Sequence, residues 1–246
     1  MFFLSFFLST ACTKENSWEE VNARTLKLYH QGSHSEAVKI AKEALRSAES
    51  ESKPKPHRLA TSLNNLALIY QAQNRYADAE PLYKRAIVLW ENSLGKEHRH
   101  VATCLNNLAV LYKFQGRYKE AEPLYKRALK IDEKVLGKDH PDFGADMNNL
   151  GELYRVLGRY DEAEILFKQA LGVVEKSLGN EHPNASKTID NLAFLYQAQG
   201  RYAEAIPLYE RALAIDKKSL GPKHPKVVML LVNMAECYKK MGKKGD

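Results

Sequence analysis

The chain has 246 residues, 44% of them hydrophobic, and a formal net charge of +7 at pH 7. This length would suit one or two ordinary globular domains, and the positive charge would suit a nucleic-acid-binding protein. However, much of the basic charge lies in Lys-Arg and Lys-Lys pairs with acidic neighbours, and no segment combines basic with aromatic residues. We therefore expect no nucleic acid as a partner. The pairs are Lys84-Arg85, Lys126-Arg127 and Lys217-Lys218.

Residues 1–12, MFFLSFFLSTAC, are apolar as far as Leu8 and end in small residues before Cys12. The run is too short to span a membrane, but it has the apolar core and cleavage zone of a secretory signal. Its Ser-Thr-Ala-Cys end resembles a bacterial lipoprotein processing site, which implies lipidation of Cys12 and a protein that is exported and anchored to a membrane. No basic residue precedes the apolar run, so a cytoplasmic protein whose N-terminus has no targeting role is the alternative.

After this leader, the sequence repeats itself every 42 residues, and a fixed period of about 20–50 residues is the signature of stacked structural repeats. Residues 13–52 carry a degenerate first copy, which we expect to act as a cap because an end copy has only one neighbour. Four full units follow within residues 57–225, at about 60–95, 102–137, 144–179 and 186–221. Residues 226–246 are predicted to form a C-terminal capping helix and tail. One asparagine marks the period: Asn65, Asn107, Asn149, Asn191 and Asn233.

Each full unit predicts two helices joined by a tight turn. In the unit 102–137, an apolar stripe with helical spacing runs from Leu105 to Tyr112. Gly116 follows it in the position of a left-handed helix cap. A second stripe begins at Ala121 and ends before Gly137, and a Lys-Asp-His-Pro turn leads to the next unit.

These units resemble the tetratricopeptide repeat, although Leu, Met or Ile stands where that repeat has tryptophan. The unit exceeds the usual length of about 34 residues. Its NNLA-x-LY, GRY-x-EAE-x-LY-x-RAL and LG-x-x-HP sequences are similar to the repeats of kinesin light chain and its prokaryotic relatives. The resemblance covers roughly residue 59 to the C-terminus and implies an all-α fold, a right-handed α-solenoid of stacked antiparallel helix pairs. Its signature positions hold Leu105, Leu108, Ala109, Tyr112, Ala121 and Tyr125.

The recurring histidines and the cysteines do not suggest a catalytic or metal site. Successive histidines are a whole helix pair apart, and helices pack about 8–10 Å from one another, so two of them cannot share a zinc ion with bonds of about 2 Å. Cys104 and Cys237 lie in distant units, too far apart for a disulfide, and we expect both to be half-buried. No phosphate loop, G-x-S-x-G, H-E-x-x-H or C-x-x-C sequence occurs. We therefore expect neither an enzyme nor a cofactor. The histidines are His98, His140, His182 and His224.

Binding in a stack of this kind is expected on the concave surface. If Leu108 and Tyr112 mark the buried side of a first helix, a helical wheel of about 100° per residue places Asn107 and Val110 on the opposite side. The same positions in the other units, with neighbouring charged residues, define the predicted groove. Its residues are Asn65, Leu68, Asn107, Val110, Lys113, Phe114, Asn149, Glu152, Arg155, Asn191, Phe194 and Asn233.

The recurring asparagine allows two interpretations. A side-chain amide both donates and accepts hydrogen bonds, so a ladder of amides could pair with the backbone of an extended peptide. The kinesin light chain resemblance implies the same use. Alternatively, each asparagine bonds to the neighbouring first helix and stiffens the stack. The charges along the groove are mixed, which favours a peptide with alternating apolar and charged side chains.

We therefore predict a non-catalytic protein–protein interaction module that binds an extended peptide or partner segment in this groove. The alternative is a structural or assembly scaffold, a homo-oligomer that self-associates through the ends of the stack or its convex face. We expect contact with a membrane only through a lipid on Cys12.

Overall fold

The computed structural model describes residues 17–51 and 55–242, and the predicted leader with Cys12 lies outside them. These described residues form eleven α-helices and no β-strand. The helices are α1 (Trp18–His30), α2 (His34–Ser50), α3 (Pro56–Ala72), α4 (Tyr76–Leu94), α5 (Arg99–Phe114), α6 (Tyr118–Leu136), α7 (Pro141–Val156), α8 (Tyr160–Leu178), α9 (Pro183–Ala198), α10 (Tyr202–Leu220) and α11 (Pro225–Gly242).

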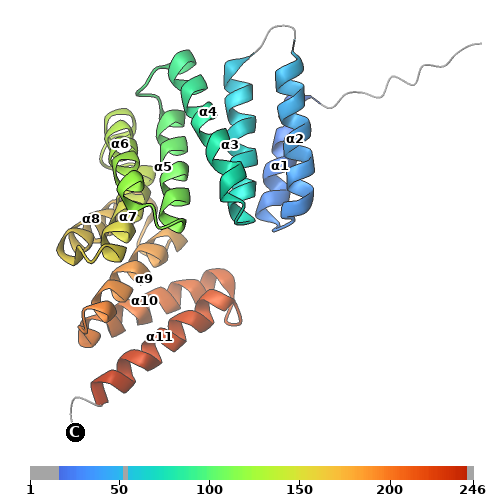
Figure 1. Cartoon of the computed structure of the whole chain (residues 1–246). Helices are drawn as coiled ribbons and strands as arrows, with labels where there is room; N and C mark the ends of the chain where they lie inside the picture. Colours follow the sequence, from blue (N-terminus) through green and yellow to red (C-terminus); the bar gives the residue numbers. More distant parts are fainter. Residues whose placement is uncertain (1–16, 52–54, 243–246) are drawn as a thin grey trace, which may run out of the picture.

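The helices form five antiparallel pairs and a single last helix, stacked into a curved solenoid (Figure 1). Odd-numbered helices are the first helices of their units, and even-numbered helices are the second. Each first helix has Cα atoms within 8 Å of the next first helix, whereas no two successive second helices approach this closely in the described residues. First helices therefore line the concave side and second helices the convex side. This architecture confirms the predicted all-α solenoid of helix pairs.

The turn inside each unit uses a left-handed residue. Gly116, two residues after the last residue of α5, has a φ of +72°, which confirms the predicted cap. Asn74 stands at the equivalent position after α3 and has a φ of +59°. Asparagine tolerates this region because its short polar side chain can hydrogen-bond locally. The turn is therefore conserved in shape where the glycine is absent.

The turn between units depends on the His-Pro pair. Nδ1 of His140 accepts a hydrogen bond of 3.1 Å from the backbone N–H of Asp142, and Pro141 is the first residue of α7. The histidine thus satisfies an N–H group that the helix start leaves unpaired, and proline is tolerated there because it has no N–H to satisfy. The bond recurs at three other turns, with His98, His182 and His224.

Small residues bring the two helices of a unit together. Gly151 on α7 faces Phe167 on α8 so closely that an added Cβ atom would lie 2.9 Å from Cε1 of the phenylalanine. Cys104 and Cys237 are both fully buried rather than half-buried as expected, and Cys104 packs against Tyr83 of the preceding unit. Free cysteine behaves as a small apolar residue in such positions.

The last helix, α11, has two apolar faces. Val227 and Leu230 are buried against the preceding unit, as expected of a capping helix. Val228, Leu231 and Tyr238 are 50%, 44% and 51% exposed. In the earlier units, the residues at the positions of Val228 and Leu231 pack against the second helix of their own unit, as Gly144 and Met147 do against α8. Tyr238 instead donates a hydrogen bond to Glu210 on the preceding second helix, α10. Because α11 has no second helix of its own among the described residues, it covers α10 but leaves this second face in solvent.

Helices long and apolar enough to cross a membrane do not occur among the described residues.

Candidate functional site

The candidate site is the concave surface of the solenoid, built by the first helices α3, α5, α7, α9 and α11. Its polar floor is a ladder of asparagine pairs. Nδ2 of Asn107 donates a hydrogen bond of 3.2 Å to Oδ1 of Asn64 in the preceding first helix. The same bond joins three other pairs of first helices: Asn65 to Asn22, Asn149 to Asn106, and Asn191 to Asn148.

The ladder matches the second of the two interpretations, in which the asparagine bonds to the neighbouring first helix. Asn65 is only 7% exposed, so this rung is part of the interior. Asn107, Asn149 and Asn191 are half-buried, and each bond uses one of their two amide N–H groups. An amide also has a second N–H and a carbonyl oxygen. Contact with a peptide through these groups stays a prediction.

Two phenylalanine side chains lie beside the ladder and face solvent. Phe114 is 61% exposed, and its ring stacks on that of Tyr76 with centroids 6.4 Å apart. Phe194 is 39% exposed, and the Arg155 guanidinium carbon lies 4.7 Å from its ring centroid. Val110 and Leu68 are half-buried between the rungs. The groove therefore offers apolar surface next to hydrogen-bonding groups.

An ion pair crosses the middle of the groove. Nζ of Lys113 on α5 lies 2.6 Å from Oε2 of Glu152 on α7, with side chains 10% and 31% exposed. Lys187 on α9 is further along the same surface. Loss of surrounding water lowers the pKa of this lysine, and the charge of Glu152 acts in the opposite direction. The sequence predicted these charges, but not that two of them pair with each other.

In two units, a tyrosine of the second helix holds a glutamine of the first helix. The Gln71 side chain accepts a hydrogen bond from the Tyr83 hydroxyl (3.0 Å), and Gln197 accepts one from Tyr209 (2.6 Å). The two units between them have Lys113 and Arg155 in place of these glutamines. In the unit of Arg155, Phe167 stands at the position of the tyrosine and has no hydroxyl, and Arg155 stacks on Phe194. Sequence analysis missed this relation, although comparing the two positions across the units would have found it.

Two aspartates, the half-buried Asp190 and the buried Asp216, lie at the C-terminal end of the groove. Asp190 takes the place that asparagine holds in the earlier rungs, and burial raises the pKa of its carboxyl to about 6. Lys226 opposes this shift and forms an ion pair of 2.8 Å with Asp216, which is 1% exposed. Asn233, the last predicted member of the ladder, is half-buried on α11. At the last step of the ladder, a carboxyl group therefore replaces the asparagine amide as the possible acceptor.

Successive units are also joined by a three-residue contact that sequence analysis missed. Nη1 of Arg117 lies 2.6 Å from Oε2 of Glu80, and the Tyr112 hydroxyl donates to the same carboxylate (2.9 Å). The guanidinium carbon lies 4.0 Å from the tyrosine ring centroid. The side-chain hydrogen bond from Arg117 is the largest cause that lowers the pKa of Glu80, to about 2. The contact recurs with Arg159, Glu122 and Tyr154, and with Arg201, Glu164 and Tyr196.

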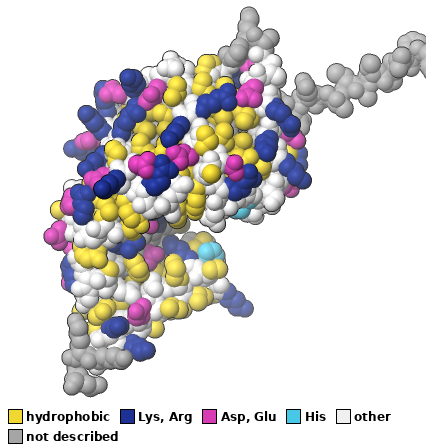
Figure 2. All heavy atoms as spheres, in the orientation of Figure 1, with side chains coloured by type: hydrophobic (Ala, Val, Ile, Leu, Met, Phe, Trp, Pro, Cys, Tyr) yellow, Lys and Arg dark blue, Asp and Glu magenta, His cyan; other side chains and the backbone are white. Residues whose placement is uncertain are grey.

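This contact explains the GRY-x-EAE sequence, because the arginine of one copy pairs with the last glutamate of the same sequence in the unit before it. On the face shown in Figure 2, basic and acidic side chains are interspersed, and neither sign forms a continuous patch. No group of three or more potential metal-ligating side chains lies close enough together in the described part of the chain to hold an ion.

Comparisons with known proteins agree with this geometry. A tetratricopeptide repeat family model matches residues 26–87, 58–134, 144–218 and 185–246, and a second model of the same family matches residues 106–177. No match was found among curated proteins.

Solved structures with a similar fold include two that are 27% identical to this chain. One is BtubC (BKLC) from P. vanneervenii, with a TM-score of 0.71 over 84% of this chain and 82% of that chain. The other is a putative kinesin light chain with nearly identical TPR-like repeats from Podosopora anserina, with a TM-score of 0.66 over 82% and 96%. The pilF protein of Pseudomonas aeruginosa, 18% identical, shares the fold with a TM-score of 0.60 over 92% and 86%.

Proposed function

The chain belongs to the tetratricopeptide repeat family, and on this premise we propose that it is a non-catalytic module that binds an extended segment of a partner protein in its concave groove. Repeats of this family generally mediate protein–protein interaction or scaffolding. Because a fold alone does not identify a function, the proposal depends on the groove itself.

The observation that carries the proposal is the exposure of Phe114 and Phe194 beside the asparagine ladder. Aromatic side chains at interfaces provide much of the binding energy. The asparagine amides next to them can form hydrogen bonds with the backbone of the bound segment, whatever its sequence. Lys113, Glu152 and Arg155 would select charged side chains between the apolar ones.

The test compares three forms of the full chain in capture of partners from a lysate of its source. The groove form carries Phe114→Ala and Phe194→Ala. The matched control carries Ile165→Ala, which removes an exposed apolar side chain (57%) from the second helix α8. We expect a partner that the parent and the control retain and the groove form loses. Equal capture by all three forms would contradict groove binding. Circular dichroism first verifies that the three forms have the same helical content.

A scaffold that self-associates through the end of the stack is the second candidate, and α11 supplies the observation that favours it. Its exposed Val228 and Leu231 hold positions that a second helix covers in the other units. Sedimentation at several concentrations distinguishes the two candidates. A mass that rises with concentration and returns to that of the monomer with Leu231→Glu would support self-association. A mass that stays monomeric would rule it out.

We also propose that Cys12 is lipidated and anchors the chain to a bacterial membrane. The support is the Ser-Thr-Ala-Cys sequence after an apolar run. Mass spectrometry of the N-terminal peptide from the source organism tests this. We expect a peptide that begins at Cys12 and carries the mass of acyl chains, whereas an unmodified peptide that contains residues before Cys12 would contradict it.

A further inference from the structure

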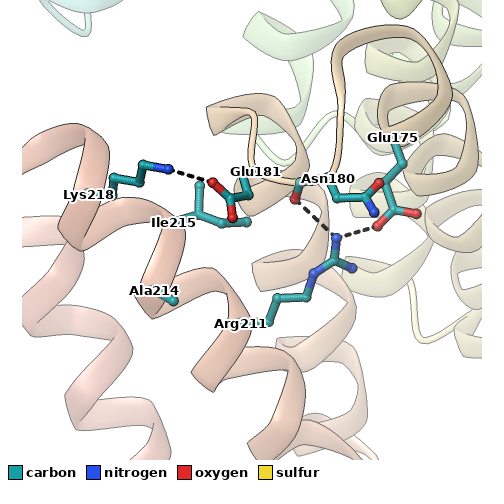
Figure 3. A pocket seen from close by; sticks show the side chains of 7 residues that line it. All are labelled: Glu175, Asn180, Glu181, Arg211, Ala214, Ile215 and Lys218. Carbon is teal, nitrogen blue, oxygen red and sulfur yellow. Dashed lines mark hydrogen bonds and ion pairs between the residues drawn. The ribbon is translucent and has the colours of Figure 1, made fainter.

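A recurring arginine joins successive second helices on the convex side, and one unit lacks it. Figure 3 shows the contact between α8 and α10: Nη2 of Arg211 lies 2.6 Å from Oε1 of Glu175 and donates a hydrogen bond of 3.1 Å to the Asn180 backbone carbonyl. These groups line a pocket of about 590 Å³. Nearby, Lys218 and Glu181 form an ion pair. The guanidinium thus joins a helix to the turn that follows the preceding second helix.

The same contact occurs two units earlier. Nη2 of Arg127 on α6 lies 2.5 Å from Oε1 of Glu91 and donates a hydrogen bond of 3.3 Å to the Lys96 carbonyl. Before that, Arg85 on α4 pairs with Glu49 at 3.2 Å. An arginine at this position therefore pairs with a glutamate of the preceding second helix at three places in the stack.

Between α6 and α8, the position belongs to Gln169. Its amide makes no hydrogen bond to the Glu133 carboxylate or the Lys138 carbonyl within the described residues, although these are the equivalents of the two acceptors. Glu133 instead pairs with the Lys138 side chain at 3.2 Å, and its side chain is 43% exposed. The equivalent Glu91 and Glu175 are 19% and 26% exposed. The acceptors remain in place, but the donor that covers them elsewhere is missing.

A pocket of about 520 Å³ lies at this junction. Seven of its lining residues lie 42 positions before the seven residues in Figure 3, so every residue of that pocket has an equivalent here. Four further side chains extend it over apolar surface: Leu129, Phe143, Met147 and Leu166. At one of the seven shared positions, Gln169 replaces the arginine, and this change removes the donor to the Glu133 carboxylate and the Lys138 carbonyl.

We propose that this pocket binds an arginine side chain of a partner protein. The partner's guanidinium donates to the Glu133 carboxylate and the Lys138 carbonyl, as Arg127 and Arg211 do in their own junctions. The methylene stem of the arginine lies against Leu129, Phe143 and Leu166. The bound residue takes the place of the arginine that this chain has in the other units.

The acceptors favour arginine over lysine. A guanidinium has several N–H donors in a fixed planar fork, so it can reach a carboxylate and a carbonyl at once, whereas an ammonium is a compact point charge. A purely apolar side chain would fill the space between Leu129 and Leu166 but would leave Glu133 in its present ion pair. Most of the pocket lies on α6, α8 and the turn after α6, and none of its lining residues belongs to the predicted groove.

The test uses the full chain labelled with ¹³C at its methionine methyl groups, because Met147 lines the pocket. The probes are N-acetyl-arginine methylamide, the corresponding lysine and norleucine compounds, and free L-arginine. We expect saturable shifts of the Met147 methyl signal with the blocked arginine, and affinity weaker by about tenfold for the lysine and norleucine compounds. Gln169→Arg should abolish the response, because the chain's own guanidinium then occupies the acceptors.

Two control variants separate loss of the site from loss of the fold. Glu133→Gln keeps the shape of the acceptor but removes its charge, and we expect it to weaken the blocked arginine. Glu175→Gln makes the same change at the junction that already contains Arg211, and it should leave the Met147 response unchanged. The proposal is overturned if no signal saturates, if Gln169→Arg responds like the parent, or if norleucine binds as well as arginine. Tighter binding of free L-arginine than of the blocked form would indicate a small-molecule site and would overturn the proposal that a partner protein binds here.

Discussion

Nδ2 of Asn107 lies 3.2 Å from Oδ1 of Asn64, which is one period and one residue earlier in the chain. The bond joins the second asparagine of one NNLA sequence to the first asparagine of the sequence before it. Both members of the repeated Asn-Asn pair are therefore needed, one as donor to the preceding unit and one as acceptor from the following unit. The ladder fixes the register between first helices, and the groove residues are positioned by that register.

Asn107→Ala is expected to lower the free energy of unfolding by about 1 kcal/mol, because it leaves the buried Asn64 carbonyl without its donor. Chemical denaturation with urea measures the change. Asn92→Ala provides the control, because Asn92 is exposed on α4 and the same atoms are removed. A loss no greater than that of the control would show that the ladder does not stabilise the stack.

The Glu80 contact predicts sensitivity to acid. The pKa of Glu80 is lowered from 4.5 to about 2, with the Arg117 hydrogen bond as the largest cause. A lowered pKa stabilises the folded state fully above the unfolded value, and this contribution is lost as the pH falls from about 5 to about 2. Because the group is partly solvated, we expect about 1 kcal/mol. Glu80→Gln should be less stable than the parent at pH 7 and should show a smaller change between these pH values.

The buried carboxyl pair between α6 and α7 predicts the opposite dependence. Burial is the largest cause that raises the pKa of Asp146, to about 8, and the neighbouring Asp132 raises it further. The pKa of Asp132 is also raised by burial, while its hydrogen bond with Asp146 and the charges of Arg99 and His140 lower it. A raised carboxyl pKa means that the folded state holds its proton more tightly, so stability falls as the pH rises from about 4 to about 8.

Asp146→Asn should flatten this dependence, because the amide supplies the hydrogen bond to Asp132 without having to keep a proton. We expect the variant to be more stable than the parent at pH 8 and less different from it at pH 5. Thermal unfolding at the two pH values measures this. Parallel curves for the two proteins would show that the pair does not titrate in this range.

Two glycines within helices predict changes of opposite sign. A Cβ atom at Gly151 would lie 2.9 Å from Cε1 of Phe167, so Gly151→Ala forces the helices apart and should cost about 1–3 kcal/mol. A Cβ atom at Gly172 meets no atom within 4 Å, so Gly172→Ala should stabilise the chain by about 1 kcal/mol through helix propensity. Urea denaturation of both variants tests the pair. Stabilisation by Gly151→Ala would contradict the close packing of α7 on α8.

The fold could be predicted because its signals are local and occur several times. Gly116 and the His-Pro pair at His140 act within a few residues of their own helix ends, so each can be recognised without the structure. The exposed side chains Phe114 and Phe194 followed from a helical wheel, because the packed side of a first helix was already known. The bonding of the asparagines remained open, since an amide fits both a peptide and a neighbouring helix.

The sequence by itself thus determined the period, the helix pairs and the side of each first helix that faces the groove, because hydrophobic spacing and turn residues encode them within one unit. Only the tertiary structure decided how polar groups one period apart are paired. It showed that Asn107 bonds to Asn64, that Lys113 pairs with Glu152, and that Glu133, without an arginine at position 169, pairs with Lys138 instead. These results depend on the rotation and distance between stacked units, which no single unit contains.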